Sequence, residues 1–255
     1  MVTTALLLSA GGMFGAYQAG AWKALAPVFV PDLVVETSAG ALNGWAIAGG
    51  CTPQELIDIW LDPRMEKMMR VRWRWSSWKG LWDPEPLETA ARELCEHYRP
   101  RIPFALTLTG IPRPRARLVR GEQVTWRHLA ASCSVPTGFP PVAVDGGLYV
   151  DGGVLGVLPI WAAVECGADR AVAVDALPEM PSRVVRTAAR IGAWMGPRRR
   201  GVADIEVLRI ARKLGSLHDA MHWRAANARR WIEQGEQDAA ELAGRLASER
   251  AIPLK

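Results

Sequence analysis

The feature that most constrains this chain is a short apolar strand that breaks abruptly into a helix of small residues. Residues 33–35 predict the strand, residues 38–48 predict the helix, and Ser38 stands at the break. A sharp strand-to-helix turn lifts that hydroxyl out of the backbone, next to a helix N-terminus that attracts negative charge. The run from Glu36 to Gly40 is close to the G-x-S-x-G form of a nucleophile elbow. The simpler alternative is that Ser38 only caps the helix.

A glycine-rich loop precedes this elbow and follows the first predicted strand. Residues 2–8 predict a buried strand, and residues 16–25 carry apolar residues at helical spacing. Between them stand Gly11, Gly12 and Gly15. Glycine lets a backbone approach a ligand closely and turn its N–H groups toward it. The loop therefore predicts a cradle for an anion, either a phosphate or the oxyanion of a reacting ester.

A third segment of interest lies near residue 150. Two short apolar runs flank a glycine turn at residues 145–147 and predict a hairpin, and Asp151 and Gly152 follow it at once. The preceding residues 134–141 hold too many prolines for a helix or a strand. We therefore expect a shaped loop that leads, through the hairpin, to an aspartate at the end of a strand.

The order of the first elements indicates the fold class. The chain opens as strand, helix, strand, helix with short connections, which is typical of a parallel sheet with helices on both faces. No long linker or repeat divides the chain, so we expect a single domain over residues 1–255. Its catalytic core would take about residues 1–180. Residues 181–255 would form a helical cover, with helices over residues 203–227 and 228–248.

Together, the glycine loop, the serine elbow and the aspartate after the hairpin resemble the patatin-like phospholipases, roughly over residues 5–175. The resemblance implies an α/β, three-layer fold with a central, mostly parallel sheet flanked by helices. It also implies a serine acyl hydrolase that cleaves lipid esters through an acyl-enzyme, without a metal or an organic cofactor. The residues it identifies are the nucleophile Ser38, the base Asp151, the oxyanion-hole glycines Gly11, Gly12 and Gly15, and the supporting Gly40 and Gly152.

Two residues depart from the pattern of that family. Glu36 stands where the elbow of the family has glycine, and Phe14 stands where the glycine loop usually has arginine or lysine. We hypothesise that a carboxylate two residues before the nucleophile crowds the elbow and opposes a developing oxyanion. An alternative is therefore a catalytically weak relative that binds lipid without turnover.

Two other classes of enzyme stay open at this point. Residues 10–15 fit the dinucleotide-binding fingerprint with alanine for its first glycine, and Glu36 follows where an acid would bind ribose. This favours a Rossmann-type NAD(P)-binding oxidoreductase but leaves the serine elbow unexplained. The serine, acid and late histidine of an α/β-hydrolase would be Ser38, Asp151 or Asp175, and His218. In that fold, however, the elbow comes after several strands.

Charge and tryptophan content bear on the partners. A net charge of +5 and a pI near 9.3 suit an anionic partner such as a phospholipid surface. From Arg70 to Trp82, cations interleave with tryptophans. This segment predicts either a lining of the acyl groove or a flap that contacts a membrane peripherally. No recognisable nucleic-acid-binding module accompanies it, so we expect no nucleic acid as partner.

The cysteines and the apolar runs bear on location. The four cysteines are scattered and lack the C-x-x-C spacing of a zinc or redox site. No apolar run approaches the ~18 residues that a membrane-spanning helix needs. We therefore expect a cytoplasmic protein with reduced thiols that meets a membrane, if at all, only at its surface.

Overall fold

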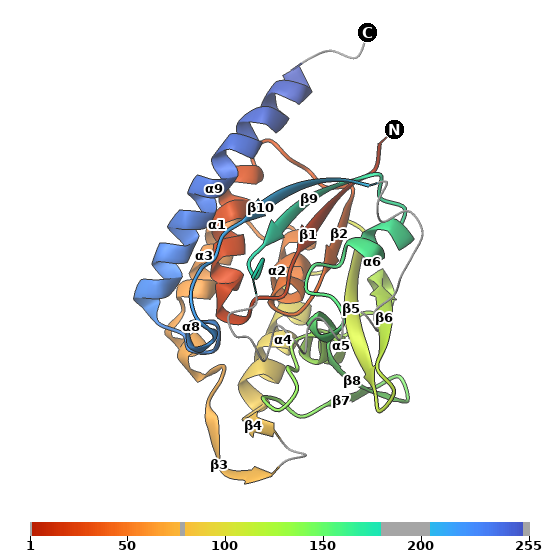
Figure 1. Cartoon of the computed structure of the whole chain (residues 1–255), viewed down its shortest axis with the longest axis vertical. Helices are drawn as coiled ribbons and strands as arrows, with labels where there is room; N and C mark the ends of the chain where they lie inside the picture. Colours follow the sequence, from red (N-terminus) through yellow and green to blue (C-terminus); the bar gives the residue numbers. More distant parts are fainter. Residues whose placement is uncertain (1, 77–79, 180–204, 252–255) are drawn as a thin grey trace.

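A mixed sheet forms the centre of the molecule (Figure 1). The computed structural model describes residues 2–76, 80–179 and 205–251, in which eight strands form this sheet and two more form a separate hairpin. The strand order is β10-β9-β1-β2-β5-β8-β7, with β6 beside β5. The strands are β1 (Thr4–Leu8), β2 (Leu33–Glu36), β3 (Val71–Ser76), β4 (Gly80–Trp82), β5 (Phe104–Ile111), β6 (Arg115–Arg120), β7 (Val142–Val144), β8 (Gly147–Asp151), β9 (Arg170–Asp175) and β10 (Glu206–Ala211).

Helices cover both faces of this sheet. The α-helices are α1 (Gly15–Leu25), α2 (Ala39–Ala48), α3 (Pro53–Leu61), α4 (Glu85–His97), α5 (Trp126–Ser132), α6 (Ile160–Glu165), α8 (Leu217–Met221) and α9 (Ala225–Ala251). Short 3-10 helices are η1 (Gly12–Phe14), η2 (Pro63–Lys67), η3 (Gly121–Gln123) and η4 (Gly152–Val154). Strands β10, β9, β1, β2 and β5 run parallel, which confirms the predicted α/β class with a mostly parallel sheet flanked by helices.

Alternate residues of the central strands enter two different cores. Leu6 and Leu8 of β1 pack in the larger core with residues of α1, α2, α3 and α9, whereas Ala5 and Leu7 pack with α6 on the other face. This follows from the two-residue period of a strand, which sends successive side chains to opposite faces. The buried central strands are therefore mainly apolar on both faces, as expected for a parallel sheet, apart from a few buried polar residues such as Glu36 of β2.

The last part of the chain departs from its prediction. For the described residues 205–227, the predicted helix is wrong, because β10 and the short α8 lie there and one continuous helix, α9, crosses the expected boundary at residue 228. Val207, Ile210 and Leu214 recur every three or four residues, which mimics a helix. The segment forms a strand instead because the N–H and C=O groups at the edge of β9 need partners, and β10 supplies them in parallel register. The predicted cover over residues 181–204 lies outside the described residues.

Strand β5 brings the two halves of the site together. It pairs with β2 through Leu106 and then runs on past the end of β2, where it pairs antiparallel with β8. In that second pairing Leu108 stands opposite Asp151, the last residue of β8. Asp151 thus lies just beyond the end of β2, where the chain turns through Ser38 into α2. The register of one strand therefore places two side chains that are far apart in the sequence at the same edge of the sheet.

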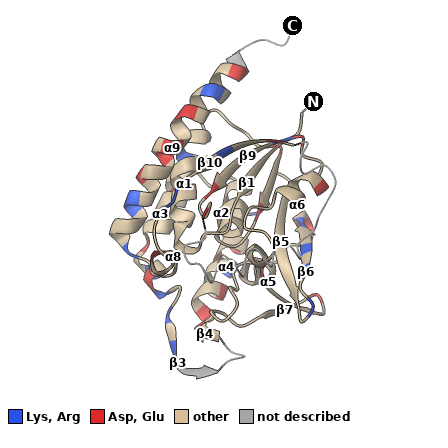
Figure 2. Ribbon diagram, in the orientation of Figure 1, with Lys and Arg blue, Asp and Glu red and all other residues tan. Residues whose placement is uncertain are grey.

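The hairpin of β3 and β4 projects from the body and rests on the proline-rich loop of residues 134–141 (Figure 1). The N–H of Leu81 donates to the carbonyl oxygen of Thr137 at 3.0 Å, and that of Trp82 donates to Gly138 at 2.8 Å. Two basic residues, Arg70 just before β3 and Arg72 within it, lie at the described start of the hairpin (Figure 2). The predicted interleaving of cations and tryptophans falls partly outside the described residues, because the side chains of residues 73–79 are not among them.

Candidate active site

Ser38 occupies the sharp turn between β2 and α2. Its φ of 58° and ψ of −128° are a strained conformation for a residue with a side chain. Strain of this kind is typical of a nucleophile elbow, in which the turn exposes the hydroxyl at a helix N-terminus. Gly40 lets the turn stay tight, since a Cβ there would lie 2.5 Å from the carbonyl oxygen of Leu8.

The hydroxyl of Ser38 contacts Asp151 directly. It donates a hydrogen bond to Oδ2 of Asp151 at 2.6 Å, and both residues are only 4% exposed. The N–H of Gly153 donates to Oδ1 of the same carboxylate at 2.7 Å. Burial raises the pKa of Asp151 to about 6, against the opposing effect of these two hydrogen bonds. The carboxylate is therefore more basic than an exposed aspartate, yet ionised at neutral pH.

The proline-rich loop and β5 hold the backbone of Asp151. The N–H of Asp151 donates to the carbonyl oxygen of Ser134 at 3.0 Å, at the start of that loop. Gly152, the predicted supporting glycine, packs against β5, where a Cβ would lie 2.4 Å from the carbonyl oxygen of Thr107. The backbone is thus held at Asp151 itself and at the next residue, and this fixes the position of the carboxylate.

A residue that the sequence pattern does not indicate, Ser132, anchors the elbow. The backbone N–H of Ser38 donates to Oγ of Ser132 at 2.9 Å, and this Oγ in turn donates to the carbonyl oxygen of Thr107 at 3.1 Å. A hydrogen bond of 2.6 Å between the hydroxyls of Thr37 and Thr107 also links the elbow to β5. Ser132 is completely buried at the end of α5, and a serine directly after the apolar run Leu129–Ala131 was the available sign.

The glycine loop presents backbone donors near the elbow. Among the residues that the structure describes, the N–H groups of Gly11 and Gly12 donate to no other group, so they are available to an oxyanion. The N–H of Gly15 instead donates to the carbonyl oxygen of Gly12 as α1 begins. A Cβ on Gly15 would lie 2.3 Å from the ring of Trp60, so the structure gives Gly15 a packing role in place of the predicted donor role.

A buried polar network ties the glycine loop to the elbow helix. The side-chain amide of Asn43, on α2, donates to the carbonyl oxygen of Gly15 at 3.0 Å and to Gln18 Oε1 at 2.9 Å. Gln18 donates to the carbonyl oxygen of Ser9 at 2.8 Å, and Trp60 donates to Asn43 at 2.8 Å. Because every partner is buried and paired, the network fixes the distance between loop and elbow.

Contrary to our hypothesis, the side chain of Glu36 does not crowd Ser38. Its side chain is completely buried, accepts a hydrogen bond from the N–H of Leu8 at 2.7 Å, and fills space beside Gly44. A Cβ at Gly44 would lie 2.4 Å from Glu36 Cγ, so α2 makes room for the carboxyl. Burial holds the pKa of Glu36 well above its usual range. A carboxyl enclosed in this way cannot reach a ribose, which removes the main support for the dinucleotide-binding alternative.

Phe14, the second departure from the family pattern, also faces the core. It is buried, and its ring meets that of Trp231 on α9 edge-on, with ring centroids 4.9 Å apart. Such a pair contributes about 0.5–1.5 kcal/mol beyond the apolar area that it buries. Phe14 therefore anchors the glycine loop to α9 and leaves the loop without a basic side chain at this position.

No histidine in the described residues hydrogen-bonds to Ser38 or Asp151. His128 is buried and contacts Asp145 at 3.0 Å and Thr125 through its other ring nitrogen. His218 stacks on His222 along α8, with ring centroids 3.9 Å apart. Asp175, the alternative acid, forms an ion pair with Arg209. The geometry thus favours a Ser38–Asp151 pair over a triad that includes His218.

The described residues offer neither a cluster of metal ligands nor a membrane-spanning helix. Within residues 2–76, 80–179 and 205–251, no group of three or more His, Cys, Asp or Glu side chains is placed to hold a metal ion. In the same ranges, no helix combines the length and the apolar character needed to cross a bilayer.

Comparisons with known proteins identify the family and the fold. The chain is 29% identical over 182 residues to a protein named lysophospholipase NTE1 from Mycosarcoma maydis, a match over 67% of the chain but only 9% of that much longer protein. The crystal structure of VipD from Legionella pneumophila has the same fold, with a TM-score of 0.53 and 12% identity over 96% of this chain and 67% of that one. The sequence profile of the patatin-like phospholipases matches residues 6–164. The chain belongs to the patatin-like phospholipase family, a family of lipid ester hydrolases.

Proposed function

We propose that the chain is a serine acyl hydrolase that cleaves acyl esters of lipids, of the phospholipase A, lysophospholipase or esterase type. The observation that carries this proposal is the 2.6 Å hydrogen bond from Ser38 to a buried Asp151 at a strained elbow. Membership of the family and similarity to a protein named lysophospholipase support a lipid ester as the substrate.

In the first half of the reaction, Asp151 acts as general base. Its Oδ2 takes the proton of Ser38 as Oγ attacks the ester carbonyl carbon, and a tetrahedral oxyanion forms. The free N–H groups of Gly11 and Gly12, with the N-terminus of α2, stabilise that negative charge. Each such donor is worth about 3 kcal/mol in the transition state. The intermediate then expels the alcohol, which takes the proton from Asp151 and leaves an acyl ester on Ser38.

In the second half, water replaces the alcohol. Asp151 accepts a proton from water as the water oxygen attacks the acyl-Ser38 carbonyl, and the second oxyanion uses the same donors. Collapse of this intermediate releases the carboxylic acid, and the proton held by Asp151 returns to Ser38. Neither half requires a metal ion or an organic cofactor. The raised pKa of Asp151 suits a group that must both take and return a proton.

Labelling with a fluorophosphonate tests this function. A fluorophosphonate forms a stable bond with an activated serine, so we expect mass spectrometry to find the label on Ser38. Ser38→Ala should take up no label at that peptide, and Asp151→Asn should slow labelling of Ser38. Vesicle binding without any labelling would contradict the hydrolase and support a lipid-binding relative that lacks turnover.

The hairpin of β3 and β4 is the proposed contact with an anionic lipid surface. Val71 and Leu81 are 60% and 40% exposed there, and Val135 of the proline-rich loop is 38% exposed. Exposed Lys67 and Arg70 lie just before β3. Apolar side chains that enter the headgroup region, together with nearby cations, suit peripheral binding to a membrane. This contact, a cytoplasmic location and the absence of a nucleic-acid partner are parts of the same proposal.

Vesicle co-sedimentation tests the lipid contact. Val71→Asp/Leu81→Asp should weaken binding to anionic vesicles while hydrolysis of a water-soluble ester continues. Val30→Asp is a matched control, because Val30 is 65% exposed and precedes β2, at the edge of the sheet away from Ser38. Equal vesicle binding by the wild type and the hairpin variant would rule out this surface.

A further inference from the structure

Ser9 directly follows β1, at the start of the glycine loop, and is completely buried. Its hydroxyl oxygen accepts a hydrogen bond from the N–H of Ala176 at 2.9 Å and donates one to the carbonyl oxygen of Ala10 at 2.8 Å. A serine hydroxyl has a single proton, and an N–H can only donate to it, so that proton goes to Ala10. The two bonds together hold the side chain in one orientation.

The contact with Ala10 also orients the next backbone N–H. The carbonyl of Ala10 and the N–H of Gly11 belong to one trans peptide group, so they point in opposite directions. By holding the carbonyl, the Ser9 hydroxyl therefore sets the direction of the Gly11 N–H, which donates to no other group in the described parts of the chain. This constraint matters because glycine accepts more backbone conformations than other residues, so a peptide group beside it rotates at little cost.

The preceding peptide group is held as well. The carbonyl oxygen of Ser9 accepts a hydrogen bond from the side chain of Gln18 at 2.8 Å, and the N–H of Ala10 donates to the carbonyl oxygen of Val157 at 2.9 Å. Along the chain from the carbonyl of Ser9, the N–H of Gly11 is thus the first backbone group without a partner among the described residues. It is the group left for a ligand.

This part of the glycine loop lies beside the proposed dyad. A Cβ on Gly153 would lie 2.9 Å from Oδ1 of Asp151 and 3.0 Å from the Cβ of Ala10, so little space separates Ala10 from the carboxylate. On the elbow side, a Cβ on Gly40 would lie 2.8 Å from the carbonyl oxygen of Ser9. The donor that Ser9 orients is therefore next to the place where an ester carbonyl would meet the nucleophile.

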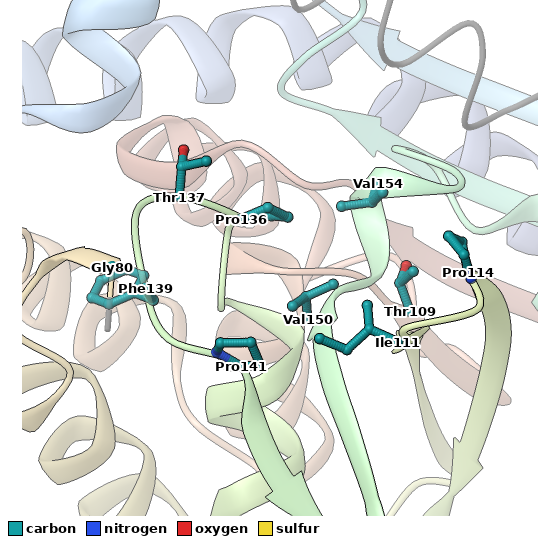
Figure 3. Close-up of a pocket in the computed structure, with 10 residues that line it drawn as sticks. All are labelled: Gly80, Thr109, Ile111, Pro114, Pro136, Thr137, Phe139, Pro141, Val150 and Val154. Carbon is teal, nitrogen blue, oxygen red and sulfur yellow. The ribbon is translucent and has the colours of Figure 1, made fainter. Parts of the chain in front are cut away.

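A cavity of about 230 Å³ lies on the opposite side of β8, between the proline-rich loop and the turn that joins β5 to β6 (Figure 3). Val150 lines it, and successive residues of a strand point to opposite faces, so Asp151 points away from it. The described residues that line the cavity are mostly apolar and include neither Ser38 nor a residue of the glycine loop. The charge of an oxyanion at Ser38 therefore falls on the side of the glycine loop.

We propose that Ser9 is a positioning residue of the oxyanion hole: its hydroxyl holds the Ala10–Gly11 peptide so that the Gly11 N–H faces the oxygen of the reacting carbonyl. This inference rests on the proposed acyl hydrolase function. Because Ser9 is completely buried, it acts on the substrate only through the peptide that it holds. Loss of its hydroxyl should therefore weaken stabilisation of the oxyanion more than binding of the neutral ester.

Steady-state kinetics of Ser9→Ala tests this role. With a nitrophenyl ester, kcat should fall about tenfold or more while KM stays within about twofold, since a misdirected donor affects the transition state and not ground-state binding. Tyr17→Phe is the matched control, because it removes another buried hydroxyl, which bonds Asp238 at 2.8 Å and links α1 to α9. Its kcat should stay near that of the wild type. Similar kcat values for Ser9→Ala and Tyr17→Phe would overturn the proposal.

A thionoester separates a lost hydrogen bond to the oxyanion from a general loss of structure. Sulfur replaces its carbonyl oxygen, and sulfur accepts hydrogen bonds only weakly. The wild type should therefore prefer the oxygen ester over the thionoester of the same acyl chain, and Ser9→Ala should lower this ratio of kcat/KM several-fold. Tyr17→Phe should leave the ratio unchanged. An unchanged ratio in Ser9→Ala would mean that Ser9 has only a structural role, which overturns the proposal.

Ser9→Cys covers the case in which Ser9→Ala does not fold. A thiol is only slightly larger than a hydroxyl but is a weaker donor, so both kcat and the ester ratio should lie below those of the wild type. Wild-type values in a Ser9→Cys protein whose fold is verified by circular dichroism would overturn the proposal. Wild-type protein that neither hydrolyses the esters nor takes up a fluorophosphonate at Ser38 contradicts the proposed function and, with it, this inference. An active wild type with unchanged ratios in the Ser9 variants contradicts the role of Ser9 alone.

Discussion

Two buried carboxyl groups end strands that both pair with β5, and they differ in what they contact. Asp151 at the end of β8 accepts a hydrogen bond from the hydroxyl of Ser38, whereas Glu36 at the end of β2 accepts one from the backbone N–H of Leu8. Burial raises the pKa of both. A raised pKa is therefore not enough to identify a catalytic base. The hydrogen-bond donor also matters, because a serine hydroxyl can give up its proton in the reaction and a backbone N–H cannot.

The largest expected difference between the two carboxyls concerns turnover. Asp151→Asn removes the proton acceptor of Ser38 and should lower kcat on a short nitrophenyl ester by about 10²–10⁴-fold. Glu36→Gln keeps an oxygen acceptor for Leu8 and should stay within about threefold of wild type, which is below 1 kcal/mol. The measurement is kcat of both variants from steady-state kinetics, with circular dichroism to verify the fold. A similar loss in both variants would mean that Glu36 has a part in the chemistry.

The pH dependence should also separate them. Asp151 must be ionised to accept the proton, so kcat/KM should fall about tenfold for each pH unit below about pH 6 and stay level above it. The direction follows from a carboxylic acid whose active form is the deprotonated one. Glu36→Gln should leave this inflection in place when rates are measured across that range. If Glu36→Gln shifts the pH of this inflection, the titrating group is Glu36 and not Asp151.

A smaller effect is expected at the hydrogen bond that anchors the elbow. Ser132→Ala removes the acceptor of the Ser38 N–H and should lower kcat several-fold, in line with about 1 kcal/mol for one hydrogen bond. KM should change little, because Ser132 acts through Ser38. Ser134→Ala is the matched control: Ser134 is equally buried, and its hydroxyl donates only to the carbonyl oxygen of Ala130. Equal kcat values in the two variants would remove the positioning role of Ser132.

The smallest effect on activity, although a measurable one on stability, is expected around Glu36. Gly44→Ala places a methyl group 2.4 Å from Glu36 Cγ and should lower the free energy of unfolding by about 1–3 kcal/mol. Glu36→Ala/Gly44→Ala should recover part of that loss, because the two side chains share one space. Denaturant titrations of the single and double variants give the coupling. If the changes in the free energy of unfolding are additive, the absence of a side chain at Gly44 is not what allows a glutamate at residue 36.

Local patterns in the sequence predicted much of the framework. Apolar runs predicted the central strands, and the residues from Thr52 to Glu55 form a capping box at the start of α3, which is a pattern of the same local kind. Ser38 and Asp151 were recognisable because their neighbours are small or apolar residues at breaks between elements. These signals depend on residues within a few positions of one another, so a reader of the sequence can find them without knowing the fold.

What only the tertiary structure decided depends on contacts between distant segments. The register of β5 with β8 sets the 2.6 Å approach of Ser38 to Asp151, and Ser132 reaches the elbow because α5 packs on β5. β10 forms a strand because β9 offers it an edge, although its spacing of apolar residues suggests a helix. The sequence by itself determined which residues could react. Packing and strand pairing determined which of them meet, because the free energy of those contacts belongs to pairs of segments and not to either segment alone.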